Sequence, residues 1–435
     1  MYYEDNVIER STITKLLWNL LPLLCLLAVG NVLDRLDLTY AAPTMDSVLR
    51  LTADQVRHAN DAFDIGCLLA GLPAAAGILI LGARRWIAAV VVAWGVITMV
   101  QGAAWSSGSL YVLRVLLGTA EVGLIPAMVF YLTEWMPPRY RSLPIAVIIA
   151  VASLVPVIGD QLANLALVVP PLLRITQWRW VFFAEGLPAV WLGLHMLGAL
   201  PQTPPEANWL HHPERHWLLM QLREASRARG ASRFNDGLRS AANWKLAAAR
   251  LAVAAVAGSL GMWVPLAMQQ TDYLSPGVGA VIMAVATVLG AVAAFVPGLP
   301  WNTRPWLRRA LAIGLAVAGI LLATAAILPS AMMAVLVLAF IAILLPPLLA
   351  LTWVLAPYVL AGSAAAAGFA VLAMAGALGD LCASTLSVVR HDATTRCFIL
   401  ALLCLAAALL SLGMDRQLPA DTRASAPAGS EQRRL

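Results

Sequence analysis

The chain has 435 residues, of which 61% are hydrophobic and only 12% charged, with a formal net charge of +6. About 25% of the residues of a soluble domain are charged, so this composition excludes an ordinary soluble protein and indicates an integral membrane protein. The basic excess requires no nucleic-acid partner, because membrane topology and contact with anionic lipids account for it. The five cysteines are odd in number and lie mostly in apolar runs, which favours reduced core residues over a disulfide framework.

Apolar blocks long enough to cross a bilayer as helices recur along the chain. The first six are expected at about 17–43, 55–81, 85–105, 109–136, 142–169 and 179–200. The other six are expected at about 245–270, 277–298, 308–328, 331–357, 361–388 and 397–414. The pattern predicts an all-α membrane protein with twelve transmembrane helices in two six-helix halves, an organisation found in many secondary transporters.

A polar connection separates the two sets of helices. We expect an N-terminal half over 1–200, a cytoplasmic linker over 201–243, a C-terminal half over 244–414 and a disordered cytoplasmic tail over 415–435. The linker contains His211, His212 and His216, but no acidic or cysteine ligands accompany them at a convincing spacing, so no metal site is predicted.

The distribution of basic residues predicts the orientation in the membrane. Most of the 29 lysines and arginines, Arg250 among them, are expected on the side that carries both termini. The exceptions on the far side are Arg50, Arg57, Arg174, Arg179, Arg390 and Arg396, while Arg35 and Arg114 fall inside helices. The positive-inside rule then predicts a multi-pass protein of the cell inner (plasma) membrane with both termini cytoplasmic.

Three charged residues, Asp34, Arg35 and Asp37, interrupt the first long apolar segment. An ionisable side chain near the centre of a bilayer costs about 2.5 to 3.5 kcal/mol on insertion scales, so such residues indicate a functional site. Neighbours on a helix point about 100° apart, and Asp34 and Arg35 therefore cannot pair with each other. Each needs a partner on another helix, which predicts a helix bundle with a polar interior.

Arg114 and Glu121 lie seven residues apart in the predicted helix 109–136. They share one face but are separated by about 10.5 Å along the axis, so they would serve two levels of one cavity, with Asp34 at a depth between them. Carboxylates that gain and lose protons, beside arginines that bind carboxylates, suit the proton-coupled movement of an organic anion. The alternative is that these charges form static pairs that hold the bundle together.

Other intramembrane groups give weaker signals. Asp64 either lines the pathway or sits near the outer interface, and Gln161 either contacts substrate or makes structural hydrogen bonds. Thr352 and Trp353 could bond to a ligand and stack on it, although a tryptophan in a membrane helix usually serves packing. Asp380 follows a run of small residues that permits close helix approach.

Taken together, several stretches resemble the anion:cation symporter branch of the major facilitator superfamily, which includes carriers of hexonates, aldarates, tartrate and phthalate. The stretches are Leu33-Asp34-Arg35 and residues 82–87, 114–126, 178–189, 207–210 and 361–370. The resemblance implies the twelve-helix major facilitator fold and alternating access. It also implies that Asp34 and Glu121 are proton-linked acids and that Arg35 and Arg114 serve the anionic substrate or its charge network. Thr352 and Trp353 fall near a substrate-lining segment of that family.

The chain also departs from the family pattern. Neutral or apolar residues replace hydrogen-bonding or gating residues at Val32, Cys67, Leu79, Ile80, Ala373 and Ala377. The charged set is kept while much of the neutral polar lining is lost, which predicts a substrate less hydroxylated than a sugar acid.

These observations predict a symporter that takes up a small organic anion, a carboxylate or sugar acid, together with protons. Its expected partners are this substrate, protons and membrane lipids, and the expected state is a monomer without a cofactor. An enzyme is not predicted, because no nucleophile with its base and no phosphate loop stands out. Two alternatives remain: an exporter or facilitator without proton coupling, and a non-transporting sensor built on a transporter scaffold.

Overall fold

The computed structural model describes residues 2–49, 51–159, 176–229, 232–269, 276–299, 303–328, 331–388 and 392–416. Within these ranges the secondary structure is helical and no strand occurs. Eleven spans in the described part are long and apolar enough to cross a membrane. Helix α11 (Ala241–Gln269) occupies the remaining place in the predicted set of twelve. The all-α, twelve-helix prediction is therefore confirmed.

The first half begins with α1 (Tyr2–Leu49), which extends well beyond the apolar block expected at 17–43. The other helices of this half are α2 (Ala53–Leu81), α3 (Ala83–Gln101), α4 (Ser107–Glu121), α5 (Leu124–Trp135), α6 (Ser142–Ser153) and α8 (Gln177–Ala199). A turn at Val122 and Gly123 divides the predicted helix 109–136 into α4 and α5. Ser107–Trp135 is nevertheless one candidate membrane span, as predicted, although the turn divides it into two helices. Pro126 supplies a reason for the turn, because it has no amide hydrogen to continue the ladder toward residue 122.

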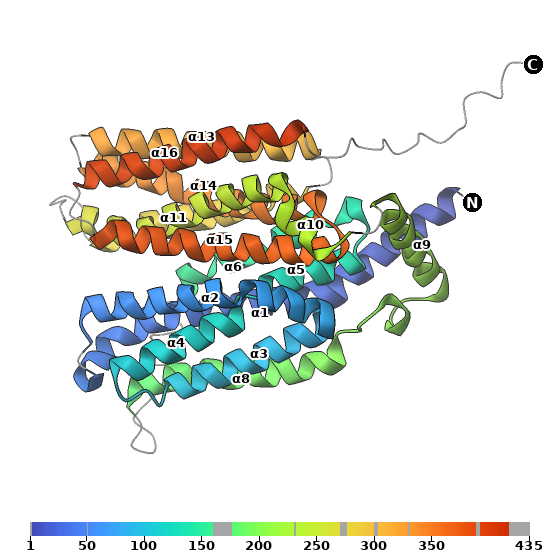
Figure 1. Cartoon of the computed structure of the whole chain (residues 1–435), viewed down its shortest axis with the longest axis horizontal. Coiled ribbons are helices and arrows are strands. Elements are labelled where there is room, and N and C mark those ends of the chain that lie inside the picture. The colour runs from blue at the N-terminus through green and yellow to red at the C-terminus, as the bar shows by residue number, and fades with distance from the viewer. Residues whose placement is uncertain are drawn as a thin grey trace, which may run out of the picture.

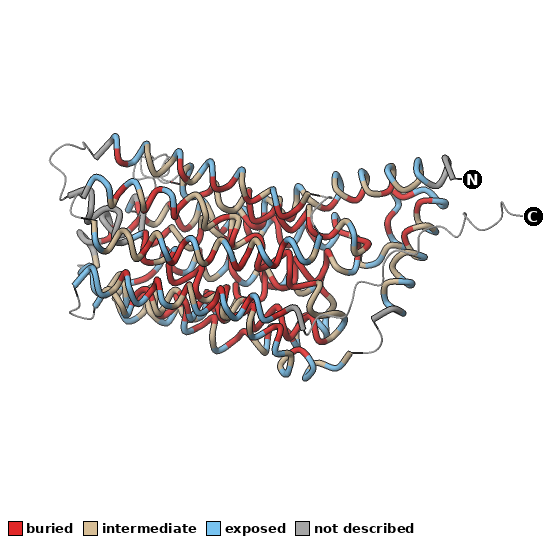
Figure 2. The backbone as a smooth tube through the Cα atoms, turned by 90° about the horizontal axis from the view of Figure 1, so that it is seen from above, coloured by how far each residue is buried: buried red, intermediate tan, exposed pale blue. Residues whose placement is uncertain are grey.

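The second half contains α11, α12 (Pro276–Ala293), α13 (Arg304–Ile327), α14 (Ala331–Val359), α15 (Gly362–Val388) and α16 (Ala393–Leu412). Figure 1 shows α1, α3, α4 and α8 gathered on one side of the bundle and α13, α14 and α16 on the other. Helices α2 and α15 pack against each other across the boundary between the halves. Buried residues concentrate in the interior of this assembly, as Figure 2 shows.

The polar linker folds in part. Helices α9 (His212–Arg229) and α10 (Phe234–Arg239) form within it, and α9 lies beside α1 at the end of the bundle where α1 begins (Figure 1). Lys15 Nζ donates to Glu214 Oε2 at 2.8 Å, and Ser11 Oγ donates to Glu214 Oε1 at 2.6 Å. These contacts attach the linker to the first half. The tail expected to be disordered lies almost entirely outside the described residues.

Small residues allow the charged helices to approach one another. A Cβ atom at Gly118 on α4 would overlap the Phe63 carbonyl of α2, and a Cβ atom at Gly66 on α2 would overlap the Val115 carbonyl of α4. Glycine at both positions therefore lets the two backbones come into contact. This close packing brings the polar residues of α4 near those of α1 and α2.

Candidate transport site

A cavity of about 190 Å³ lies between the two halves. Helices α1, α2, α4, α5 and α6 contribute its walls from the first half, and α11, α14 and α15 from the second. The charged residues that line it are Arg35, Glu121 and Arg250. Most of the remaining lining is apolar or small: Ala28, Val32, Cys67, Val122, Ile125, Pro126, Ile149, Ala152, Leu349, Trp353, Ala373 and Ala377.

Arg35 lies where α1 faces the cavity. Its Nε is 3.7 Å from Glu121 Oε2, and its guanidinium carbon lies 4.8 Å from the centre of the Phe63 ring. The arginine side chain is 38% exposed whereas the Glu121 side chain is fully buried. Because Arg35 lines the cavity, its exposed part is open to that space. The prediction that Arg35 needs a partner on another helix is confirmed.

Glu121 ends α4 immediately before the turn into α5. Its Oε2 accepts a 2.8 Å hydrogen bond from Asn31 Nδ2 on α1, whereas its Oε1 is buried without a hydrogen-bond partner. Asp34 interacts electrostatically with Glu121. Glu121 thus stands between Arg35 in the cavity and Asp34 behind it.

Arg250 corrects a prediction made from charge topology. The sequence placed it among the cytoplasmic charges, but it lines the cavity from α11 and its Nε lacks a hydrogen-bond partner. It interacts electrostatically with Asp380 and with Arg35. A Cβ atom at Gly376 would lie 2.6 Å from Arg250 Nη2, so the glycine on α15 provides the space for this guanidinium group.

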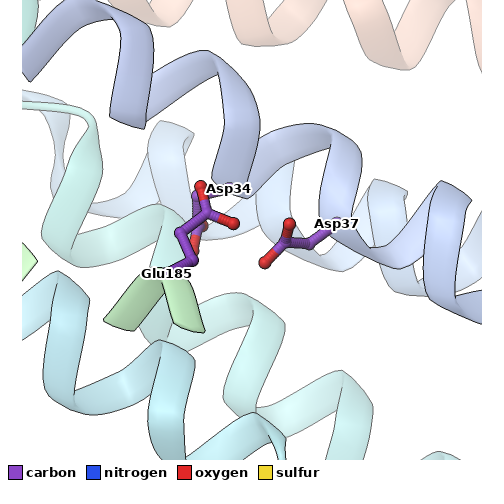
Figure 3. A group of neighbouring side chains, drawn as sticks. All are labelled: Asp34, Asp37 and Glu185. Atoms are coloured by element: carbon purple, nitrogen blue, oxygen red, sulfur yellow. The ribbon is translucent and has the colours of Figure 1, made fainter. Parts of the chain in front are cut away.

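Three carboxyl groups meet behind the cavity, inside the first half. Asp34 and Asp37 share one face of α1, three residues apart, and Glu185 approaches them from α8 (Figure 3). An oxygen from each lies within 4.8 Å of the others. Thr98 Oγ1 on α3 donates a hydrogen bond to Asp34 Oδ1. The sequence showed Asp37 as a charge in an apolar segment, but the part played by Glu185 was missed.

Arg114 faces this carboxyl group cluster and not the cavity. It is 1% exposed, and its Nε and Nη2 have no hydrogen-bond partner. It interacts electrostatically with Asp34 and Asp37 of α1, with Glu121 of its own helix and with Glu185. The prediction that Arg114 and Glu121 line two levels of one cavity was therefore wrong for Arg114, because Glu121 lines the cavity whereas Arg114 is buried beside the acids of α1 and α8.

The other predicted substrate-binding residues occupy different environments. Trp353 lines the cavity, whereas the buried Thr352 hydroxyl donates to the Leu349 carbonyl at 2.7 Å and does not line it. Asp64 is buried outside the lining and interacts electrostatically with Asp380 and Arg35. Gln161 lies outside the described residues.

This architecture of two helical halves around a charged cavity agrees with comparison to known proteins. The profile of the Major Facilitator Superfamily matches residues 24–383. The chain belongs to the major facilitator superfamily. A solved major facilitator, the proton:xylose symporter XylE, superposes with a TM-score of 0.69 over 91% of this chain and 95% of that chain, at 14% sequence identity. Likeness at this identity supports the fold alone.

Curated relatives of this major facilitator are transporters. The "Putative tartrate transporter" of Agrobacterium vitis is 30% identical over 287 residues, which cover 65% of this chain and 64% of the relative. The inner membrane transport protein RhmT of Escherichia coli K12 is 27% identical over 261 residues, 60% of each chain. The chain thus spans slightly less than two thirds of the length of these relatives. They identify a transporter family and leave the substrate to be inferred.

Proposed function

We propose that this major facilitator carries a small organic anion together with protons by alternating access. The observation on which the proposal rests is that Arg35 and Arg250 line one cavity from opposite halves, with Glu121 beside Arg35. Guanidinium groups present a fork of N–H donors that matches a carboxylate. An anion bound to both arginines would contact both halves at once.

Glu121 links anion binding to protons. When it is ionised, Glu121 is an electrostatic partner of Arg35, 3.7 Å away. When it is protonated, the attraction is lost and Arg35 is free to bind the substrate carboxylate. Protonation and anion capture therefore favour each other, because both keep the charge around Arg35 balanced. This is the physical requirement for symport.

The cavity lining defines the class of anion. Its volume of about 190 Å³ fits a small molecule, and apolar side chains such as Val32, Ile125 and Leu349 surround the charged groups. A molecule rich in hydroxyl groups would leave many of those groups unpaired against this wall, at a cost for each one. The proposed substrate is therefore a small carboxylate with few hydroxyl groups, and the tartrate-transporter name of one relative supports a carboxylic acid.

The proposal includes a membrane orientation. The ends of α9 and α10, where basic residues are frequent, lie with the start of α1 at one end of the bundle (Figure 1). The positive-inside rule favours the cytoplasm for this end. We place the protein in the inner membrane as a monomer, because one chain encloses one complete cavity.

Uptake of radiolabelled carboxylates into proteoliposomes tests the proposal directly. Wild type is expected to accumulate one or more small carboxylates when the outside is more acidic, and Arg35→Ala is expected to abolish this uptake. Arg57→Ala is the matched control, because Arg57 pairs with Asp54 and Asp61 at the end of α2 and does not line the cavity. Equal uptake by wild type and Arg35→Ala would contradict the assigned site.

Two other outcomes would replace the proposed activity. Counterflow that persists without a proton gradient, together with no gradient-driven accumulation, would identify an exporter or a facilitator. A carboxylate that raises the melting temperature but never crosses the bilayer would identify a sensor. Both outcomes would contradict proton-coupled uptake.

A further inference from the structure

The carboxyl group cluster of Asp34, Asp37 and Glu185 lies apart from the anion cavity. Glu121 connects the two, because it lines the cavity and also interacts electrostatically with Asp34. Asp37 and Glu185 line a second space of about 390 Å³ between α1 and α8. Among the described residues that line this space they are the only charged ones, and the rest are apolar or small. The space on this side of the pair is therefore of low polarity.

The hydrogen bonds of the pair show that a donor between the two carboxyl groups is missing. Asp37 is 4% exposed, and its Oδ2 has no hydrogen-bond partner; Glu185 Oε1 is also buried without a partner. Yet an oxygen of Asp37 lies within 4.8 Å of an oxygen of Glu185. Two ionised carboxylates are both acceptors and repel, whereas one proton between them provides the donor and removes one charge. A shared proton would therefore stabilise these two neighbouring acids.

The charges around the pair lead to the same conclusion. The groups that face it are Asp34 from α1, Arg114 and Glu121 from α4, while α3 contributes the neutral Thr98. Arg114 is buried with two nitrogen atoms unpaired, so it supplies one positive charge to the whole group. With Arg35 beside Glu121, four acids face two arginines. This set becomes neutral when it holds two protons, and buried net charge is strongly unfavourable.

We propose that Asp37 and Glu185 form a second proton-binding site, which exchanges protons with the anion cavity through Asp34 and Glu121. One proton resides on the Asp34–Glu121 pair and a second on the Asp37–Glu185 pair. The first half would then deliver two protons with each anion. The link to transport rests on the proposed function, whereas proton binding by the pair does not.

Infrared difference spectroscopy of the purified protein tests proton binding without any transport. A pH titration of wild type is expected to show a protonated carboxyl band that Asp37→Asn and Glu185→Gln each remove. In each single variant, the new amide can donate a hydrogen bond to the remaining carboxylate in place of the shared proton. The double variant is therefore expected to lose no more intensity of the protonated carboxyl band than each single variant. Glu134→Gln is the control, because Glu134 on α5 lies outside this cluster and should leave the assigned band unchanged. A band from the Asp34–Glu121 pair is expected to remain in the double variant, whereas survival of the band assigned to Asp37 and Glu185 would overturn the proposal.

Accumulation measurements test the second half of the proposal. With the membrane potential clamped at zero, each coupled proton supports about a tenfold accumulation per unit of pH gradient. Wild type is expected to accumulate the anion about a hundredfold per unit of pH gradient. Asp37→Asn or Glu185→Gln is expected to accumulate it about tenfold and to retain counterflow. Unchanged accumulation in both variants would remove the pair from coupling.

The two measurements separate failure of this inference from failure of the proposed function. If wild type shows no proton-driven uptake but the infrared band depends on Asp37 and Glu185, the site stands and the proposed function fails. If uptake is proton-driven but neither the infrared band nor the accumulation ratio changes in the variants of Asp37 and Glu185, the proposed function stands and the second proton site fails. A sodium gradient at constant pH that drives uptake dependent on Asp37 would identify a sodium site and overturn the assignment to protons.

Discussion

Buried charge is concentrated in the first six membrane spans, whereas the last six enclose the cavity mainly with small and apolar side chains. The buried charged residues within the spans of the first half include Asp34, Asp37, Asp64, Arg114 and Glu121, with Arg35 and Glu185 partly exposed beside them, and Arg141 is buried at the start of α6. In the described part of the second half, Arg250 and Asp380 lie well inside the spans, and the buried Arg308 lies near the start of α13. The two halves therefore supply different properties to one site.

The difference shows how coupling can be kept apart from movement. Hydrogen bonds and ion pairs of the charged network join α1, α3 and α4, which belong to one half and can move as one body. In the proposed symport, protons would then be gained and lost without breaking contacts between the halves. The second half contributes a wall shaped by α14 and by the alanine-rich α15, whose residues 364–372 are all buried. Arg250 is the charged residue that this half adds to an otherwise apolar cavity wall.

The largest effect is expected from Arg250→Ala, which would make the second half a purely apolar wall. Loss of a charged hydrogen bond to a bound carboxylate costs about 1.5 to 3 kcal/mol, or about 10- to 150-fold in affinity. Isothermal titration calorimetry with the transported anion measures this directly. Arg309→Ala is the matched control, because Arg309 is exposed near the start of α13. Arg250→Lys keeps the charge but loses the fork, and an intermediate affinity is expected.

Unchanged affinity in Arg250→Ala would mean that the second half contributes shape alone. In that case Arg35 would bind the anion without help, and Arg250 would serve only as the partner of Asp380.

A smaller and more selective effect is expected from Glu121→Gln. This variant tests whether an acid of the first half couples transport to protons. The amide resembles the protonated acid and leaves Arg35 free, so anion exchange should persist. Gradient-driven accumulation should fall by about tenfold per pH unit for each proton no longer coupled. Uptake by wild type should decrease as the external pH rises, while uptake by the variant should change less with pH. Full accumulation in Glu121→Gln would place the coupling acid elsewhere.

Much of the fold and part of the site could be predicted from the sequence. Charges inside apolar segments are costly enough to mark functional positions, and helix geometry gives their depths. This reasoning correctly required Arg35 to pair with another helix, and Glu121 is its partner. Depth alone does not reveal which helices are neighbours. Glu185 was missed for that reason, because its approach to Asp37 depends on the packing of α8 against α1.

Arg250 was misplaced for a different reason. The positive-inside rule treats a basic residue near the start of a predicted helix as a topological signal, since a long side chain there can reach the interface. Helix α11 begins at Ala241, which moves Arg250 inward, and Gly376 on α15 makes room for it. That space is a property of tertiary packing between two helices far apart in sequence.

The smallest effect is expected in the linker, where Glu214 attaches α9 to the first half. Burial raises the pKa of Glu214, but hydrogen bonds from Lys15, Ser11 and the His211 amide outweigh it and lower this pKa below the ordinary glutamate value. A lowered pKa stabilises the docked state above about pH 4.3, and this stabilisation is lost as pH falls through the lowered value. Glu214→Gln should weaken docking by about 1.5 to 3 kcal/mol at neutral pH and by less in acid.

Hydrogen exchange of α9 measures this difference across pH. Protection of α9 should fall in Glu214→Gln at neutral pH and approach that of wild type as the solution becomes acidic. Glu224→Gln provides the control, because Glu224 is exposed on the same helix. Since α9 lies beside α1, exchange within the spans of the second half should not change. A uniform loss of protection across both halves would instead show that the linker stabilises the whole bundle and would contradict its assignment to the first half.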